Sequence, residues 1–208
     1  MGKQSMSLPE SYLPPEFYAR SSEEVARDLI GKGLYVRHSA NHLLCEITEV
    51  EAYTMDDEAS HAFNGLTKRN WAMFEPGGAC YVYQIYGMHL CMNIVTGGKG
   101  DGQAVLIRAA NPVKGLTWIK KRRHLQRTSR VPQTHKLLSG PGNLAQGLGI
   151  TMAHNGLTFF GDTLRVVDLG NTVPSEKVSL SKRIGITKAA HLLRRYCLAG
   201  APSLSRKG

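Results

Sequence analysis

The sequence predicts an α+β fold, a single domain in which flanking helices cover a mostly antiparallel β-sheet. Segments with strand character gather in the middle of the 208-residue chain, and segments with helical character lie on both sides of them. Such segregation is typical of helices packed on one antiparallel sheet rather than of alternating βαβ units. A chain of this length suits one compact domain. We therefore expect a short flexible segment over residues 1–12 and a single domain over residues 13–208.

The first predicted elements are a helix and two strands. Ser21 and Glu24 have the spacing of a capping box, which marks a helix start, and residues 31–33, with two glycines, end this helix. Residues 34–38 and 43–53 have the composition of strands, with a turn between them. On the second strand, side-chain alternation is expected to place five residues on one face: Cys45, Ile47, Glu49, Glu51 and Tyr53.

A β-hairpin is predicted in the middle of the chain, after a loop with a helical turn over residues 56–74. Residues 81–86 and 89–95 are rich in aromatic and β-branched side chains, which favour strands. The two residues between these strands begin with Gly87, which indicates a tight turn. We therefore expect Tyr86 to lie at the tip of the hairpin.

The remaining predicted elements are one strand, two helices and two short strands. Residues 104–109 alternate in the manner of a strand. Residues 113–127 and 142–148 are expected to be helices, the first of them strongly basic. Residues 183–186 and 194–198 are expected to be short strands near the C-terminus.

The charge of the chain restricts its partners. Lys and Arg number 26 against 16 Asp and Glu, which gives a formal net charge of +10. A basic surface attracts polyanions, and nucleic acid is the usual one. From composition alone, a basic enzyme with another kind of substrate is an equal alternative.

Cysteine use and hydropathy indicate a protein that works inside a cell. The four cysteines form no C-x-x-C pair, and reduced, buried thiols are expected. No apolar stretch approaches the roughly 18–20 residues that cross a membrane, and residues 1–7 lack the apolar core of a secretion signal. We expect a cytoplasmic or nucleoid location in a bacterium and a nuclear location in a eukaryote.

Several side chains are candidates for chemistry on a nucleic acid base. Glu51 and Tyr53 would place a carboxylate beside an aromatic ring, although a glutamate near a strand end is more often simply solvated. Tyr81 and Tyr83 share a face of the hairpin and could offer aromatic surface to a base, although a tyrosine inside a sheet is more often a core residue. Tyr86 suits a wedge between bases, and a ring folded back onto the core is nearly as frequent.

Metal and cofactor sites are not expected. His61, His89 and His124 lack the spacing of zinc ligands. The chain contains neither a phosphate-binding loop nor a dinucleotide-binding fingerprint. The basic run over residues 120–127 suits phosphate contacts, but its ordinary interpretation is a solvated helix face. From the residues alone, this is a basic, aromatic-rich domain with one candidate carboxylate.

Seven segments form an ordered series along nearly the whole chain, from about residue 13 to residue 205. They are residues 49–53, 57–61, 67–74, 81–93, 100–109, 139–144 and 183–186. This series resembles the alkyladenine (3-methyladenine) DNA glycosylase family. The resemblance implies a curved antiparallel sheet with a protruding β-hairpin, similar to the C-terminal domain of formyltransferases.

The resemblance also implies roles in the excision of a damaged base. Glu51 matches the general base that activates water, and Arg108 matches an arginine that holds this water together with the backbone carbonyl of Ile184. The positions that sandwich the flipped base are Tyr53, His61 and Tyr83.

Further positions match contacts to the base edge and to the DNA. Asn93 matches an amide that lies against the base and disfavours the 2-amino group of guanine. Tyr86 matches the side chain that intercalates at the lesion. The positions near the DNA backbone or groove are Met88, Thr67 and Arg69.

The function implied by this resemblance is base excision repair. A monofunctional glycosylase of this type, acting as a monomer without cofactor or metal, would flip a damaged purine out of double-stranded DNA. An activated water would then hydrolyse the N-glycosidic bond and leave an abasic site. Substrates would include 3-methyladenine, 7-methylguanine, hypoxanthine and ethenoadenine. Two alternatives stay open: a non-catalytic nucleic-acid-binding module and an RNA- or tRNA-processing enzyme.

The chain departs from the better-known mammalian members of that family in three places. The segment between Tyr53 and His61 is shorter, and the turn over residues 97–100 is longer. His89 stands where an aromatic residue is usual. These differences bear on the range of substrates, while every principal site residue is present.

Overall fold

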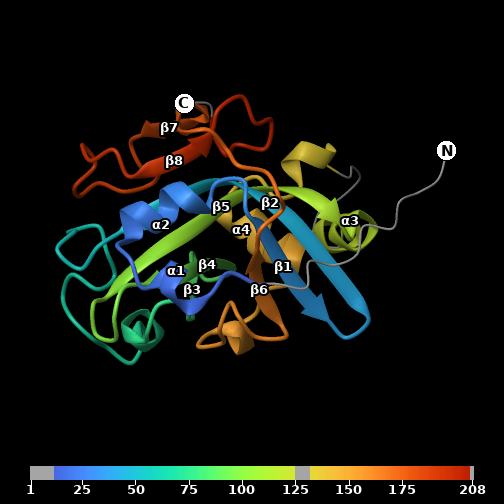
Figure 1. Ribbon diagram of the computed structural model, residues 1–208. Coiled ribbons are helices and arrows are strands. Elements are labelled where there is room, and N and C mark those ends of the chain that lie inside the picture. Colours follow the sequence, from blue (N-terminus) through green and yellow to red (C-terminus); the bar gives the residue numbers. More distant parts are fainter. Residues whose placement is uncertain (1–11, 125–131, 207–208) are drawn as a thin grey trace.

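The computed structural model describes residues 12–124 and 132–206, which form a curled antiparallel sheet surrounded by helices (Figure 1). The α-helices are α1 (Pro15–Tyr18), α2 (Ser22–Leu29), α3 (Leu116–His124) and α4 (Pro141–Leu148). The strands are β1 (Gly33–His38), β2 (Asn41–Tyr53), β3 (Cys80–Ile85), β4 (His89–Thr96), β5 (Gln103–Lys114), β6 (Leu164–Val167), β7 (Val178–Ser181) and β8 (Arg195–Leu198). The predicted α+β class is confirmed. The segment expected to be flexible lies, apart from Tyr12, outside the described residues.

Strand β2 is the centre of the sheet. The strands follow the order β3-β4-β5-β2-β1-β6, and β8 pairs with both β2 and β7. All of these pairings are antiparallel. At 13 residues, β2 is long enough to pair with β1 near its start and with β8 near its end. Strand β2 therefore pairs with three other strands of the described chain, β1, β5 and β8.

The main hydrophobic core lies between the sheet and helices α2 and α4. The predicted capping box is present at the start of α2, where Ser21 and Glu24 each bond the backbone of the other. The helix residues that are buried in this core are Val25, Ala26, Leu29, Leu144, Ala145 and Leu148. Their spacing places them on the inward faces of α2 and α4, so the helices cover one face of the sheet and leave the other face available.

The cysteines behave as small apolar core residues, as the sequence predicted. All four of them are buried and free. Burial raises the pKa of the Cys45 thiol to about 12, which keeps it protonated. Among the described residues, no helix is both long enough and apolar enough to span a membrane.

Three irregularities interrupt the pairing of β2 with β5, and two of them flank Glu49. In the register, Thr48 on β2 faces no residue of β5, and Arg108 on β5 faces no residue of β2. Each is an extra residue of the kind found in β-bulges, which re-aim the side chains that follow. Arg108, a predicted site residue, therefore lies at an irregular point of its strand.

These irregularities change which side chains share a face of β2. Cys45 and Ile47 pack in the main core, and beyond Thr48 the core residues are Val50 and Ala52. The prediction that five alternating residues share one face was therefore wrong, because the bulge shifts the alternation by one residue. The side chains that turn away from the main core are Glu49, Glu51 and Tyr53.

Two other sequence predictions were wrong in detail. The helix predicted from residue 113 begins at Leu116, because Val113 and Lys114 end β5 and Gly115 (φ 85°) makes the turn. Residues 125–127, its predicted end, lie outside the described residues. Residues 183–186 form a loop rather than a strand, because their polar groups bond to the site described next instead of to a neighbouring strand.

Candidate active site

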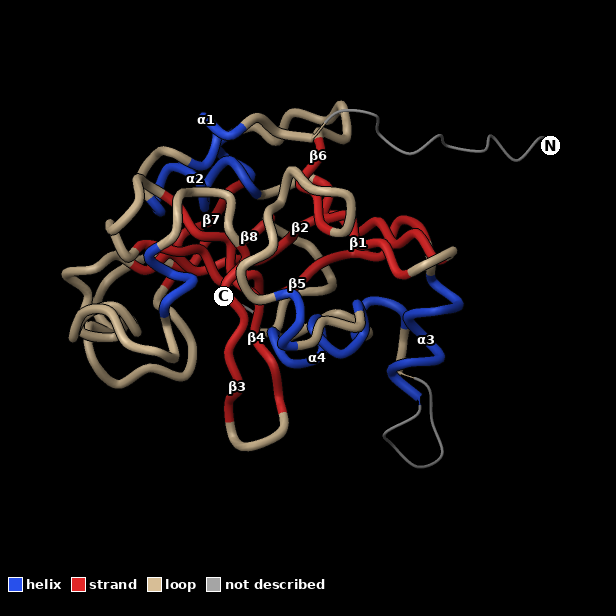
Figure 2. The backbone as a smooth tube through the Cα atoms, turned by 90° about the horizontal axis from the view of Figure 1, so that it is seen from below, coloured by secondary structure: helices blue, strands red, loops and turns tan. Residues whose placement is uncertain are grey.

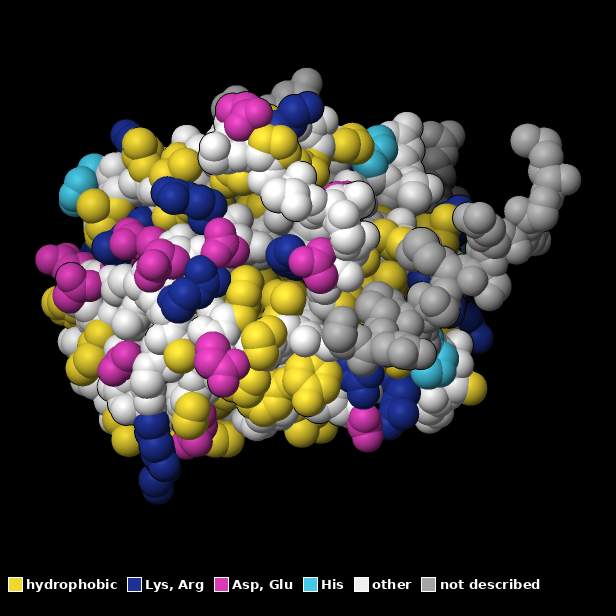
Figure 3. All heavy atoms as spheres, viewed as in Figure 1, with side chains coloured by type: hydrophobic (Ala, Val, Ile, Leu, Met, Phe, Trp, Pro, Cys, Tyr) yellow, Lys and Arg dark blue, Asp and Glu magenta, His cyan; other side chains and the backbone are white. Residues whose placement is uncertain are grey.

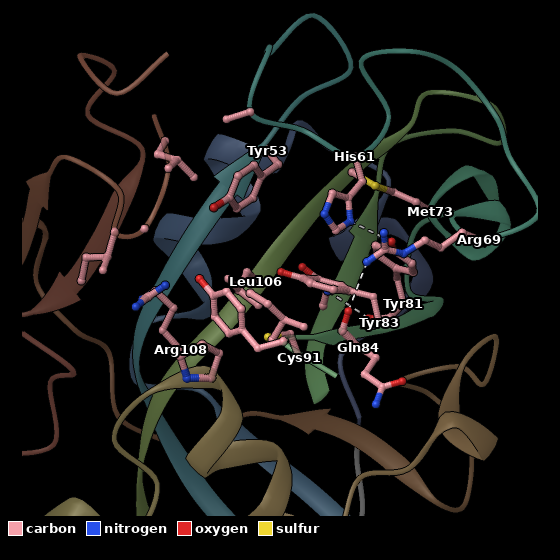
Figure 4. Close-up of a pocket in the computed structure, with 18 residues that line it drawn as sticks. Tyr53, His61, Arg69, Met73, Tyr81, Tyr83, Gln84, Cys91, Leu106 and Arg108 are labelled. Atoms are coloured by element: carbon pink, nitrogen blue, oxygen red, sulfur yellow. Dashed lines mark hydrogen bonds between the residues drawn. The ribbon is translucent and has the colours of Figure 1, made fainter. Parts of the chain in front are cut away.

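A cavity of about 620 Å³ opens on the face of the sheet that the helices α2 and α4 leave available (Figure 4). Residues of β2, β3, β4 and β5 line it, together with the loops around residues 59–73 and 184–186. Seven of the predicted site residues lie in its wall: Tyr53, His61, Arg69, Tyr83, Tyr86, Asn93 and Arg108. The whole lining runs from Tyr53 to Ile186, so the cavity brings together residues that are distant in the chain.

The register of the sheet places three site residues side by side. Asn93 on β4 pairs with Leu106 on β5, and Leu106 pairs with Glu51 on β2. Paired residues of antiparallel strands carry their side chains on the same face. The amide of Asn93 and the carboxylate of Glu51 therefore lie on the cavity side of the sheet, with Leu106 between them.

Glu51 lies directly behind the wall of the cavity. Its side chain has no exposed surface. One carboxylate oxygen accepts the hydroxyl of Tyr53 at 2.9 Å and Nη1 of Arg108 at 3.2 Å. The other accepts the backbone N–H of Ile184 at 2.7 Å. Because Tyr53, Arg108 and Ile184 all line the cavity, a small movement of one of them would bring water to the carboxylate.

The electrostatic balance at Glu51 leaves it a stronger base than an exposed glutamate. Burial raises the pKa of Glu51, although Arg108, the Ile184 amide and the Tyr53 hydroxyl oppose the shift. The resemblance implied a role for the backbone carbonyl of Ile184, whereas the contact that the structure contains is made by its N–H. This contact was not predicted from the sequence.

A second buried carboxylate, Glu49, lies beside the first and was not singled out from the sequence. It accepts Nε of Arg108 at 2.9 Å and Nε of Arg195 at 2.8 Å. It also accepts the backbone N–H and the hydroxyl of Ser205, both at 2.6 Å. The only sequence signal was its two-residue spacing from Glu51, which any strand with alternating polar residues would show.

A buried ion pair holds the loop that carries Ile184. Both terminal nitrogens of Arg183 donate to the carboxylate of Asp57, and one also donates to the carbonyl of Ala52 at 3.1 Å. The guanidinium carbon of Arg183 lies 4.6 Å from the centre of the Tyr53 ring, a cation–π distance. The Arg183 side chain therefore positions both the Ile184 amide, which contacts Glu51, and the ring of Tyr53.

Two of the three rings predicted to stack on a base, those of His61 and Tyr83, are in contact with each other. His61 and Tyr83 touch edge to face, with ring centroids 4.5 Å apart, and Nδ1 of His61 lies 2.9 Å from the hydroxyl of Tyr81. No third ring fits between two rings already in contact. A planar ligand therefore has no room between His61 and Tyr83, which line the cavity together with Tyr53.

The Asn93 amide is fixed at the floor of the cavity. Its side chain is only 4% exposed, and Nδ2 donates to the carbonyl of Tyr81 at 3.0 Å. A carboxamide held by one nitrogen cannot turn to suit a different ligand edge. The side chain of Asn93 thus lines the cavity while its amide nitrogen is bonded to the backbone of β3.

Comparison with known proteins identifies the family. A family model described as methylpurine-DNA glycosylase (MPG) matches residues 16–202. The chain belongs to the methylpurine-DNA glycosylase family. It is thus a DNA glycosylase, an enzyme of DNA repair, and the non-catalytic and RNA-processing alternatives are not needed to explain its site.

Three relatives illustrate how far the similarity extends, and each is named “Putative 3-methyladenine DNA glycosylase”. The relative from Methanoculleus marisnigri is 44% identical over 94% of this chain and 99% of its own length. The relative from Carboxydothermus hydrogenoformans is 42% identical over the same shares. The relative from Bradyrhizobium diazoefficiens is 44% identical over 91% of this chain and 88% of its own length.

The hairpin of this glycosylase projects from the body of the molecule (Figure 2). Its strands are β3 and β4, and its tip is the turn that contains Tyr86 and Gly87, with φ angles of 52° and 73°. Tyr86 is 83% exposed and Met88 is 75% exposed. The predicted hairpin is confirmed, and its exposed ring lies at the mouth of the cavity.

The other two residues predicted to contact DNA have clear structural partners. Arg69 lines the cavity and donates to the backbone carbonyl of Gln84 at 3.1 Å, which ties its loop to β3 of the glycosylase. Thr67 is exposed and donates its hydroxyl to the side chain of Asn70 at 2.9 Å. Thr67 and Met88 do not line the cavity, whereas Arg69 does.

Proposed function

We propose that this DNA glycosylase flips alkylated or deaminated purines out of duplex DNA and hydrolyses their N-glycosidic bond with a water activated by Glu51. The observation that carries the proposal is the environment of Glu51: a buried carboxylate whose donors Tyr53, Arg108 and Ile184 all line the cavity. A general base must lie within hydrogen-bond reach, or one water, of the group that it deprotonates. Glu51 lies behind three donors of the cavity wall, so a water that replaces one of these donors would meet this requirement.

The charge of Glu51 suits the transition state of the proposed reaction. Cleavage of an N-glycosidic bond develops positive charge on the sugar ring, as in glycoside hydrolysis. A carboxylate out of contact with bulk water stabilises that charge more strongly than an exposed one. Arg108 keeps the carboxylate oriented toward the cavity and supplies N–H groups for the attacking water.

The aromatic walls favour electron-poor purines. A base between Tyr53 and the His61–Tyr83 pair presents both of its faces to rings, and ring faces attract cations. Cationic alkylpurines are also good leaving groups, because breaking the bond neutralises their charge. Neutral substrates such as hypoxanthine would need protonation on the base. Asn93 would then disfavour normal guanine through its 2-amino group.

The long-range attraction to DNA comes from the net charge of +10. On the face drawn in Figure 3, acidic and basic side chains are interspersed with apolar ones, so no single-sign patch marks that face. The projecting hairpin and the cavity mouth beside it provide the features that engage a lesion. The proposed DNA-binding side is therefore the side that bears Tyr86.

The experiment that tests this function is single-turnover base release from duplexes that carry ethenoadenine, hypoxanthine or 7-methylguanine. We expect free base and an abasic site, with strand breaks appearing only after alkali treatment. Strand breaks without alkali would contradict hydrolysis by water. Tight binding with no release from any duplex would instead indicate a non-catalytic module, and release from RNA alone would indicate an RNA-processing enzyme.

Replacing Tyr86 by Ser is expected to weaken binding to lesion-bearing duplex by about 1–3 kcal/mol, the contribution of one ring stacked on a base. The ring is exposed in the free protein, so the substitution removes no core contact. Fluorescence anisotropy with an ethenoadenine duplex measures the loss. Tyr12→Ser, at a half-exposed tyrosine that does not line the cavity, is the matched control. Equal affinities of the two variants would remove the wedge assignment.

Base release is expected to fall in acid at a higher pH than an exposed glutamate would allow. Burial raises the pKa of Glu51, and a base works only when it is deprotonated. The single-turnover rate should be constant above this raised pKa and fall about tenfold per pH unit below it. A pH profile on 7-methylguanine, a base that is already cationic, measures the effect. A rate that stays flat into the range where exposed glutamates titrate would exclude Glu51 as the base.

A further inference from the structure

The second buried carboxylate, Glu49, accepts four hydrogen bonds from the described residues, whereas Glu51 accepts three. Glu49 has no role in the reaction described so far. Glu49 has no exposed surface. Although burial alone would raise its pKa, the donors of Ser205, Arg195 and Arg108 hold the pKa of Glu49 below its usual range. Glu49 is therefore a permanent anion in the folded protein, two residues from the proposed base.

Arg108 is shared among three partners, one for each nitrogen of its guanidinium. Nε donates to Glu49 at 2.9 Å, Nη1 donates to Glu51 at 3.2 Å, and Nη2 donates to the hydroxyl of Ser205 at 3.3 Å. The shortest of these contacts is the one to Glu49. The guanidinium therefore meets Glu51 through a single nitrogen.

Without Glu49, the preferred arrangement of these groups would differ. A guanidinium and a carboxylate pair most strongly through two parallel N–H···O bonds. A fork between Arg108 and Glu51 would use Nη2 together with Nη1 or Nε. Glu49 binds Nε directly and also holds Ser205, the acceptor at Nη2, so the two residues fix the guanidinium with only Nη1 directed at Glu51. A two-bonded pair would balance the charge of Glu51 more closely and add a donor to the oxygen that now accepts only the Ile184 amide, so that fewer of its roughly four lone pairs would be left for water.

We propose that Glu49 is a positioning residue, which holds Arg108 out of a two-bonded pair with Glu51 and thereby keeps Glu51 available as the base. The proposal rests on the function assigned to Glu51 above. It gives the two carboxylates different roles: Glu49 binds the guanidinium of Arg108, and Glu51 activates the attacking water. Neither carboxylate lines the cavity itself, but all three donors to Glu51 do, whereas Glu49 contacts the cavity wall only through Arg108.

The other groups that face this pair do not substitute for Glu49. Arg195 from β8 binds Glu49 and not Glu51. Tyr53 faces Glu51 with its hydroxyl, and burial raises the pKa of this phenol so that it stays a neutral donor. Cys91 from β4 is a thiol whose pKa burial also raises. Among the described residues, Glu49 is thus the anion that competes with Glu51 for Arg108.

The proposal is tested by titrating the Glu51 carboxyl in the free, full-length enzyme. NMR of protein labelled with ¹³C at the glutamate side-chain carboxyls follows this group, and the spectrum of Glu51→Gln assigns its signal. In Glu49→Gln we expect the pKa of Glu51 to fall by about one to three units, the usual effect of closer contact with an opposite charge. Single-turnover base release should fall about tenfold at its plateau, part of the 10²–10⁴-fold contribution of a base.

Two further variants separate this effect from loss of charge or of structure. Glu46→Gln makes the same change on the same strand, at a residue that bonds Asn111 and not Arg108, and should leave the Glu51 titration unchanged. Glu49→Asp keeps the charge, and so protects folding, but cannot reach Nε of Arg108. In Glu49→Asp the pKa of Glu51 should fall in the same direction as in Glu49→Gln.

Two outcomes would overturn the proposal. One is a Glu51 titration in folded Glu49→Asp that stays at the wild-type position or moves upward. The other is a shift in Glu46→Gln as large as that in Glu49→Gln. The titration needs no catalysis, so it decides the role of Glu49 even if Glu51→Gln retains full activity, a result that would refute only the assignment of Glu51 as the base.

Discussion

Replacing Glu51 by Gln should slow single-turnover base release by about 10²–10⁴-fold, the contribution of a positioned general base, while binding to damaged DNA is retained. Glutamine has the shape of glutamate and keeps one oxygen to accept the Ile184 amide, now 2.7 Å away. It cannot accept a proton from water, and it has no charge to stabilise the developing positive sugar. The reaction should therefore fail after the base has been flipped.

The measurement compares wild type with Glu51→Gln on an ethenoadenine duplex, in which the fluorescence of the lesion reports base flipping and product analysis reports release. Glu46→Gln is the matched control, and its rate should equal that of wild type. Equal losses of flipping and release in Glu51→Gln would show that the residue supports the cavity rather than the chemistry. Unchanged release would exclude it as the base.

Replacing Asp57 by Asn should lower the free energy of unfolding by about 3–5 kcal/mol, the usual cost of removing one partner from a buried ion pair. Asp57 accepts both terminal nitrogens of Arg183, a third bond from Arg194 and the backbone N–H of Ala59. The Arg183 side chain has no exposed surface, so it would be left buried with an uncompensated charge. This loss is a large part of the roughly 5–15 kcal/mol that stabilises a typical domain.

Urea unfolding followed by circular dichroism measures this loss. The control is Asp168→Asn, since Asp168 pairs with Lys32 at 2.7 Å but has a side chain 51% exposed. Surface pairs contribute only about 0–1 kcal/mol, so this variant should unfold close to wild type. A similar small effect of both variants would show that the buried pair adds nothing to stability. Because Arg183 precedes Ile184, Asp57→Asn should also reduce base release at temperatures where it stays folded.

Local features of the fold followed from the sequence because their causes are local. The capping box at Ser21 needs only Glu24 three residues later, and the hairpin turn needs only a glycine after Tyr86. The exposure of the Tyr86 ring at the tip followed from this turn and needed no knowledge of the surrounding fold. Family resemblance pointed to the residues of the cavity wall, but it could not supply their contacts.

The arrangement around Glu51 could not be read from the sequence, because its partners come from distant segments. Arg108 lies 57 residues away and Ile184 lies 133 residues away, and neither distance leaves a periodic signal. The two irregular positions, Thr48 and Arg108, arise from the pairing of β2 with β5 and have no signature in either strand alone. They turn Glu49 and Glu51 away from the main core together.

The sequence alone thus determined the local elements and the types of side chain available for chemistry. Only the tertiary structure decided that Glu51 bonds three groups of the cavity wall and that Glu49 binds two arginines behind it. The physical reason is that burial and opposite charge set the properties of an acid. Both depend on which strands and loops pack against it in the folded chain.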